Sequence, residues 1–148
     1  MTTIIEKVLQ LQDIEIFRYS YTEHLAQLAS ICRESEKEEG ASLFHRGAEC
    51  SHLYLLVEGQ VSLELESGKT VSVQKCALDQ WSFFARKPHQ YSASCLESCL
   101  LYTVSYEEMV DLLTSEPEFS WSLTRHLSEI ARSAGDDPTQ QALTQLTQ

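Results

Sequence analysis

The chain has 148 residues, of which 43% are hydrophobic and 22% charged, a composition typical of a single globular domain. Lys and Arg number 11 against 22 Asp and Glu, and the resulting formal charge of -11 disfavours nucleic acid and anionic membrane surfaces as direct partners. No apolar run approaches the roughly 18 residues of a membrane span, and the N-terminus lacks the pattern of a secretory signal, so we expect a cytoplasmic protein.

The cysteines and histidines show no spacing typical of a metal site. Five cysteines are scattered without any C-x-x-C pair: Cys32, Cys50, Cys76, Cys95 and Cys99. This pattern favours reduced thiols that pack as small hydrophobic residues. The histidines never occur as His-x-His, and no catalytic motif is present, so we expect no metal, no cofactor and no enzymatic activity.

Residues 1 to about 35 are predicted to be helical. Apolar residues recur at helical spacing in two groups, which are Ile5, Val8, Leu9 and Leu11, and then Leu25, Leu28, Ala29 and Cys32. Thr22 is predicted to be the N-cap of the second helix. The acidic run that follows is typical of a solvated loop without a function, and comprises Glu34, Glu36, Glu38 and Glu39.

Residues from about 40 to 104 show the period of two that is typical of β-strands. Residues 53–56 form a buried apolar run, and Val61, Leu63 and Leu65 alternate with polar residues. Gly59 and the turn at 67–69 separate these strands, so we expect consecutive antiparallel hairpins. After a loop, two further strands are expected at about 91–95 and 100–104.

Two helices are predicted between residues 105 and 134. Ser105 caps the first, which stops before Pro117, and the second runs from Glu118 to Ala134. One stripe of the second helix carries Phe119, Leu123, Leu127 and Ile130. This stripe either pairs with a second copy of the chain or covers the strands. Trp121 lies off the stripe, where an exposed indole would mark an interface.

The order of elements predicts a mainly β domain over residues 1–135. Many short antiparallel strands between helices are typical of a jelly roll, also called a double-stranded β-helix, with flanking N- and C-terminal α-helices. Residues 136–148 form a polar tail that we expect to be disordered.

Several segments together resemble the cyclic nucleotide-binding domain of the catabolite activator type. They are "IFRYSYTEHLAQLASICRE", "EGASLFHRGAECSHLYLLVEGQVSLEL", "YSASC" and "LLYTVSYEEMVDLLTSEPEFSWSLTRHL". The second is the most specific, because its Phe44, Gly47 and Gly59 fall at the family's spacing together with the apolar residues 53–55. The resemblance covers about residues 11–134. It implies a β-roll with a regulatory role.

The resemblance also implies where a ligand would bind, and there the sequence departs from the family. Family members hold the cyclic phosphate on a loop and helix turn that a Gly-Glu pair opens and an Arg closes ten residues after the Glu. Here those positions are Gln80, Trp81 and Tyr91. Losing the two charged contacts removes about 3–6 kcal/mol. Affinity should fall at least about a hundredfold, so we do not expect cAMP or cGMP to bind in the usual way.

Two interpretations of this altered pocket remain open. Its residues are Gln80, Trp81, Ser82, Tyr91, Ser92 and Ala93. Arg86, Lys87 and His89 either supply new anion contacts in a rebuilt loop or are exposed loop charges. The aromatic residues of this region either fill the pocket from within or form a new ligand site, and they are Trp81, Phe83, Phe84 and Tyr91.

The function expected from the sequence is that of a non-enzymatic regulatory module. The 13 residues after Gly135 are too few for a helix-turn-helix, which argues against direct DNA binding. We therefore expect action through an unidentified protein partner, with a homodimer through the last helix as one form. The alternative is a receptor for a cyclic nucleotide or another small anion.

Overall fold

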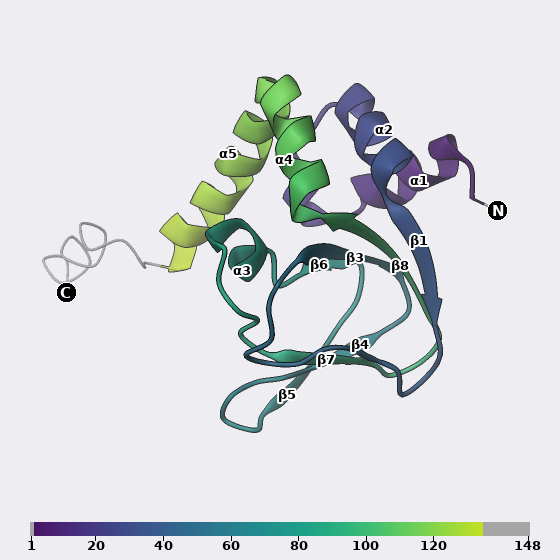
Figure 1. The fold of residues 1–148 in the computed structure, drawn as a ribbon, viewed down its shortest axis with the longest axis vertical. Coiled ribbons are helices and arrows are strands. Elements are labelled where there is room, and N and C mark those ends of the chain that lie inside the picture. Colours follow the sequence, from purple (N-terminus) through teal and green to yellow (C-terminus); the bar gives the residue numbers. More distant parts are fainter. Residues whose placement is uncertain (1, 135–148) are drawn as a thin grey trace, which may run out of the picture.

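The computed structural model describes residues 2–134, and these form a β-roll covered on one side by helices (Figure 1). The first sheet has the strand order β1-β8-β3-β6 and the second β2-β7-β4-β5, and every pairing is antiparallel. The strands are β1 (Arg33–Lys37), β2 (Ser42–Phe44), β3 (His52–Glu58), β4 (Val61–Glu64), β5 (Thr70–Val73), β6 (Cys76–Leu78), β7 (Ser92–Cys95) and β8 (Cys99–Ser105). The predicted jelly roll is thus confirmed.

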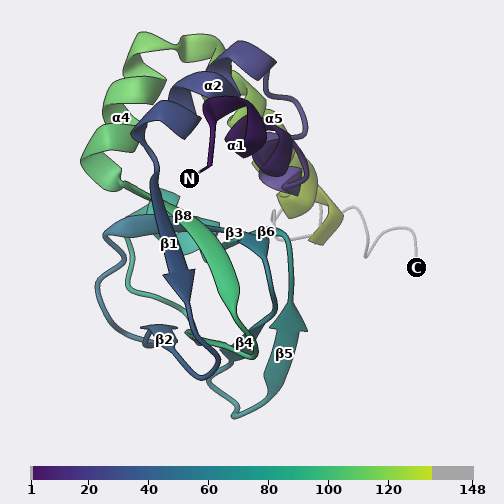
Figure 2. The ribbon, with the colours of Figure 1, turned by 90° about the vertical axis from the view of Figure 1, so that its right-hand side faces the viewer.

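The helices gather on the outer face of the first sheet (Figures 1 and 2). They are α1 (Ile4–Gln12), the short 3-10 helix η1 (Glu15–Phe17), α2 (Thr22–Ile31), α4 (Tyr106–Ser115) and α5 (Pro117–Ala134), while α3 (Gln80–Ala85) lies between β6 and β7. None of these described helices is long and apolar enough to span a bilayer.

The strand β3 divides the apolar core into two clusters. Because side chains alternate along a strand, Leu53 and Leu55 face the helices, whereas Tyr54 and Leu56 face the interior of the roll. The helix-side cluster also contains Phe119 of α5. The first sheet is therefore buried on both faces, which fixes the helices against the roll.

Three local predictions for the first half of the chain are wrong. Residues 33–37 form the edge strand β1, so the helices end at Ile31 and the roll begins before residue 40. Glu34 and Glu36 consequently lie in a strand and not in a loop. Thr22 is the first residue of α2 and makes no capping bond, because the N-cap position belongs to Tyr21.

Gly59 connects two different sheets and does not close a hairpin. The strand β3 pairs with β6 and β8, while β4 pairs with β5 and β7, so the predicted β3–β4 hairpin is wrong. Gly59 has φ +95, and a Cβ there would lie 2.6 Å from the Ser98 carbonyl oxygen. The chain passes so close to β8 that only glycine fits. The other turn, at 67–69, does join a hairpin, between β4 and β5.

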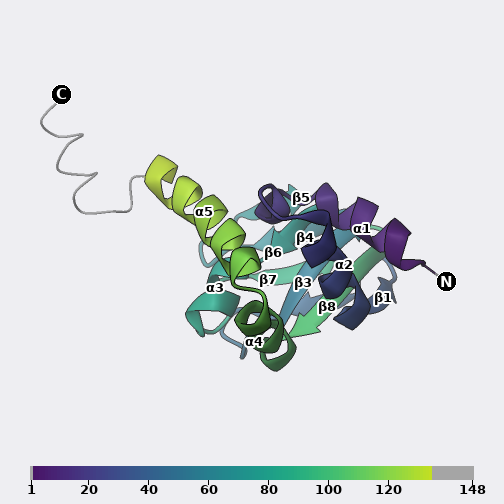
Figure 3. The ribbon, with the colours of Figure 1, turned by 90° about the horizontal axis from the view of Figure 1, so that it is seen from above.

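The stripe on α5 is divided between the core and the surface. Phe119 and Leu123 are buried in the helix-side cluster, so these two cover the roll and are not available to a second copy. Leu127 is half-buried against the same cluster, and Ile130 is also half-buried. Trp121, which lies off the stripe, is 73% exposed. Figure 3 shows the C-terminal part of α5 extending past the other helices. The expected tail at 136–148 lies outside the described residues.

Candidate functional site

The segment between β6 and β7 contains the helix α3, where the sequence predicted a loop. Asp79 immediately precedes α3 and has a left-handed backbone with φ 54 and ψ 42. This conformation is uncommon for a residue with a side chain, although Asp tolerates it better than most. Its side chain turns inward, and Asp79 is only 1% exposed.

The Asp79 carboxylate accepts hydrogen bonds from three groups, which we call the Asp79 network. The Ser82 hydroxyl donates to Oδ1 over 2.7 Å, and the Gln90 backbone N–H donates to Oδ2 over 3.0 Å. His89 Nδ1 lies 2.9 Å from Oδ2, and because an ionised carboxylate only accepts, Nδ1–H is the donor. A buried carboxylate with this many donors is well satisfied. The start of α3 therefore already holds an anion, which belongs to the chain itself.

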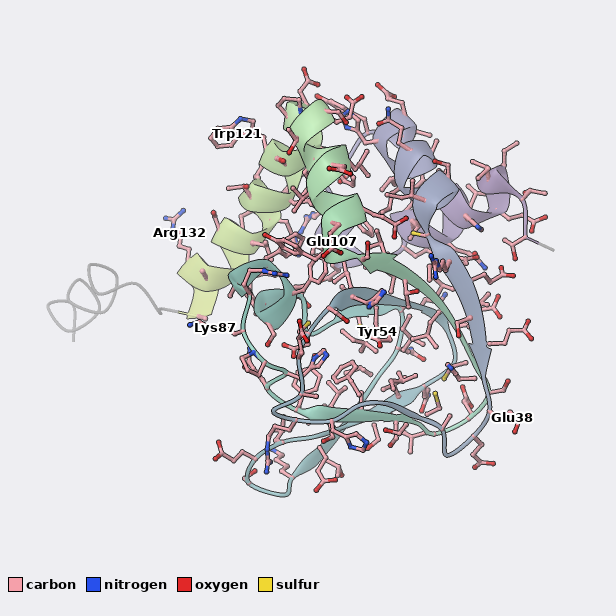
Figure 4. The ribbon with its side chains drawn as sticks, in the orientation of Figure 1. Glu38, Tyr54, Lys87, Glu107, Trp121 and Arg132 are labelled. Atoms are coloured by element: carbon pink, nitrogen blue, oxygen red, sulfur yellow. The ribbon has the colours of Figure 1, made fainter. Side chains whose placement is uncertain are left out.

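An aromatic cluster fills the roll beside this network. Phe44 lies at its centre and stacks on the His89 ring at 3.8 Å between centroids, with an interplanar angle of 9°. Tyr54 and Tyr91 pack against Phe44 at 5.3 and 5.9 Å. Figure 4 shows Tyr54 between the two sheets. Burial, followed by the charge of Asp79, raises the pKa of Tyr91, which keeps its hydroxyl neutral.

The six residues predicted for the altered pocket do not line one cavity. Gln80 lines a cavity bounded by the β5–β6 segment, η1 and α5, Ser82 joins the Asp79 network, and Tyr91 belongs to the aromatic cluster. Ala93 is buried in the roll, and the Ser92 hydroxyl accepts the Arg46 N–H. Trp81 is 40% exposed and belongs to neither apolar cluster, which argues against the interpretation that its indole fills the pocket.

Phe83 and Phe84 also lie outside the roll interior. Phe83 is fully buried in the helix-side cluster, where its ring packs edge-on against Phe84 and Tyr106. The aromatic residues that fill the roll are thus Tyr91, Phe44 of β2 and Tyr54 of β3. The aromatic residues of α3 do not fill it.

The three predicted cations do not act as one cluster. His89 is only 4% exposed and belongs to the Asp79 network, so describing it as an exposed loop charge is wrong. The Arg86 guanidinium lies over the Tyr106 ring at 3.7 Å, a cation–π contact outside the roll. Lys87 is exposed at the outer end of α3 (Figure 4).

Of the cavities that adjoin α3 or the residues directly after it, two are lined by side chains of both charges. A cavity of about 350 Å³ beside Arg86 and Lys87 is also lined by Glu49 and by Cys50, whose thiol pKa is raised by burial to about 11. The cavity beside Gln80, of about 460 Å³, is lined by Asp13, Glu15, Lys75 and His126. Neither lining concentrates positive charge in the way that a phosphate site does.

The sequence reasoning missed Asp79, the centre of this site. The sequence did contain a signal for the contact between Asp79 and Ser82, since the two residues are spaced one helical turn apart. The third partner, His89, lies ten residues along the chain from Asp79, and no local pattern links the two.

Comparison with known proteins agrees with this fold. The sequence from 34 to 116 matches the family model described as the cyclic nucleotide-binding domain. No curated protein matches the chain. The fold is similar to the N-terminal domain of a transcriptional regulator from Streptomyces coelicolor, with a TM-score of 0.75 and 23% identity, covering 86% of this chain and 95% of that one.

A second solved structure gives the same result. It is the sensor domain of the transcriptional regulator DNR from Pseudomonas aeruginosa, with a TM-score of 0.72 and 17% identity, covering 93% of this chain and 96% of that one. At these sequence identities the two structures support the fold alone. The family model, by contrast, matches more than half of the chain in sequence. This chain belongs to the cyclic nucleotide-binding domain family.

Proposed function

We propose that this chain is a regulatory domain that has no enzymatic activity, does not bind cAMP or cGMP in the family's usual way, and acts through contact with another protein. The observation that carries the proposal is the Asp79 network. Its carboxylate lies on the residue directly before α3 and accepts hydrogen bonds from Ser82 in that helix and from His89 and Gln90 after it, in the segment where the family places a cyclic phosphate.

A cyclic phosphate would have to displace this carboxylate or bind beside it. Displacement is unfavourable, because Asp79 is tethered to the chain and so has a high effective concentration at its donors. Binding beside it places two anions close together in a region of low dielectric, where like charges repel strongly. The cost of either route adds to the loss of the family's Arg and Glu contacts, because Tyr91 and Trp81 stand at those two positions.

The comparisons support a regulatory role without naming a ligand. The two similar structures belong to a transcriptional regulator and to the sensor domain of another. A family domain whose ligand region is filled by its own side chains retains the rigid roll and the helices as a surface for protein contacts.

The alternative is a receptor for a small anion that uses the cavity beside Arg86 and Lys87. One observation favours it, namely that this cavity of about 350 Å³ carries two cations in an acidic protein. Glu49 in the same lining argues against it.

Calorimetric titration with cAMP and cGMP tests the proposal on three proteins. The first is the wild type. The second is a triple variant that restores the family's residues, Gln80→Gly, Trp81→Glu and Tyr91→Arg. The third is a quadruple variant that adds Asp79→Ser. We expect no binding to the wild type or to the triple variant, because in both the Asp79 carboxylate still accepts the hydrogen bonds of its network, and in the triple variant it would also pair with the new Arg. We expect measurable binding to the quadruple variant, which lacks this carboxylate.

Each result bears on a different part of the proposal. Micromolar binding to the wild type that Arg86→Ala abolishes would establish the receptor in its place. Binding to the triple variant would show that Asp79 does not block the site. If circular dichroism shows that the quadruple variant folds and it still binds nothing, the carboxylate is not what excludes the nucleotide.

A further inference from the structure

A cavity of about 460 Å³ lies at the edge of the first sheet, where β6 is the last strand. We call it the β6-edge cavity. The short helix η1 packs against both β6 and α5, and these elements bound the cavity together with the β5–β6 turn. Figure 2 shows the C-terminal part of α5 above β6 at this edge. Gln80 is in the lining, but Trp81 and Tyr91 are not, so the cavity is separate from the aromatic cluster inside the roll.

His126 of α5 lines this cavity with an imidazole that the fold does not use. The residue is 5% exposed, and its Nδ1 is buried without a hydrogen-bond partner among the residues that the structure describes. A buried N–H without a partner is rarer than a buried acceptor without one, so the ring proton belongs on Nε2. Nε2 is not enclosed in the same way. His126 therefore offers an N–H donor to a molecule in the cavity.

Three charged side chains line the same cavity from two different segments. Asp13 and Glu15 flank the junction of α1 and η1, whereas Lys75 lies in the turn between β5 and β6. The ion pairs between residues 2 and 134 include none of the three. The lining thus offers two carboxylates from one segment, and two nitrogen donors from Lys75 and His126.

The backbone holds Lys75 in an unfavourable conformation. Within residues 2–134, the residues other than glycine that have a positive φ are Lys75, Asp79 and Arg86. The side chain of Asp79 is held by its network and that of Arg86 by Tyr106, but the ion pairs and cation–π contacts of the described residues do not involve Lys75, whose φ is 45. Strained residues of this kind gather at ligand sites.

We propose that the β6-edge cavity binds a free α-amino acid with an aliphatic side chain, of which leucine is the example tested below. The ligand's ammonium group donates to Asp13 and Glu15, and its carboxylate accepts from Lys75 and from the Nε2–H of His126. This inference goes beyond the proposed function, which concerns the segment around Asp79, and does not depend on it.

A ligand with only one charge fits this lining less well. A simple anion would face Asp13 and Glu15, a simple cation would face Lys75, and like charges repel in both cases. An α-amino acid carries both charges on one carbon, so each charge can meet its opposite. Half-buried Val73 and Ile130 line the same cavity and suit an aliphatic side chain. The volume also falls in the range of about 300–1,000 Å³ that is typical of small-molecule sites.

Calorimetric titration of the full chain with L-leucine tests the proposal, with two analogues that each lack one charge. Isocaproate has the carboxylate of leucine without the ammonium group, and isoamylamine has the ammonium group without the carboxylate. We expect leucine to bind and each analogue to bind at least about tenfold more weakly, because each loses the charge-assisted hydrogen bonds of one end.

Two variants separate a ligand contact from a structural role. His126→Phe and Lys75→Gly should each weaken leucine binding at least about tenfold. Neither should lower the urea midpoint of the free protein, because Phe leaves no buried nitrogen unpaired and Gly adopts a positive φ without strain. The matched control is His24→Phe. His24 is equally buried and has an unpartnered Nδ1, but it lies against Phe119 and Glu116, so leucine affinity should stay unchanged.

Three results would each overturn a part of the proposal. A wild type that binds no leucine up to about 10 mM would overturn the site itself. An analogue that binds as tightly as leucine would show that the site does not recognise both charges. Unchanged leucine affinity in Lys75→Gly, or in a His126→Phe protein that circular dichroism shows to be folded, would remove that residue from the site.

Discussion

Two helices of this domain begin directly after a strand, α4 after β8 and α3 after β6, and they begin in different ways. Ser105 precedes α4 with an extended backbone, and its hydroxyl accepts the Glu108 N–H in a capping box. Asp79 precedes α3 with a left-handed backbone, and its carboxylate points into the protein.

The two helix starts differ in how far along the sequence their hydrogen-bond partners lie. The partners at the start of α4 lie within three residues, so local rules determine it. The carboxylate at the start of α3 depends on His89 and Gln90, and His89 in turn stacks on Phe44 of another strand. The first start belongs to the scaffold of the roll, and the second to the segment where the resemblance to the family would place a ligand.

The largest expected effect comes from removing the Asp79 carboxylate, whose partners lie far along the sequence. Asp79→Ala leaves three inward-facing donors without an acceptor and should lower the free energy of unfolding by about 3 kcal/mol. Urea denaturation measures this. The control is Asp13→Ala, which removes an exposed carboxylate and should change stability by less than about 0.5 kcal/mol. Equal losses in the two variants would contradict a structural role for the Asp79 network.

A double-mutant cycle gives the next effect and compares the two starts directly. Asp79→Asn and His89→Gln should couple by about 1.5 kcal/mol, because the two side chains form one buried contact. Ser105→Ala and Glu108→Gln should couple by about 0.5 kcal/mol, since their contact is partly exposed. Chemical denaturation of the four variants and both doubles measures these values. A larger coupling at α4 than at α3 would reverse the comparison.

The sequence allowed prediction of the elements that local patterns determine. The Ser105 cap, the turn at 67–69 and the alternation of apolar residues were sufficient for the jelly roll. The strand β1 was hidden because four of its five residues are charged, and only its pairing with β8 makes it a strand. The backbone hydrogen bonds to β8 stabilise β1 as a strand although its charged residues do not favour one.

The candidate site was predictable only in what it lacks. From Gln80, Trp81 and Tyr91 the sequence predicts that the family's ligand contacts are missing, but nothing local indicated what replaces them. The helix α3 has six residues, too few for a periodic pattern, and the inward orientation of Asp79 depends on residues that only the folded chain brings together.

The smallest expected effect is a pH dependence at the start of α4. The Ser105 hydroxyl and then its N–H hold the pKa of Glu108 below the ordinary 4.5. Because the folded value is the lower one, this carboxylate stabilises the protein above the ordinary pKa, and the stabilisation is lost as the pH falls through the folded value. Glu108→Gln should therefore cost about 0.5–1 kcal/mol at pH 7 and progressively less below pH 4, measured by denaturation across that range. Glu107→Gln is the matched control, since Glu107 lies in the same first turn (Figure 4), and the described hydrogen bonds link Glu108 and not Glu107 to Ser105. If both variants lose the same stability with the same pH profile, the effect comes from the helix dipole, and the start of α4 is then not held by its capping box.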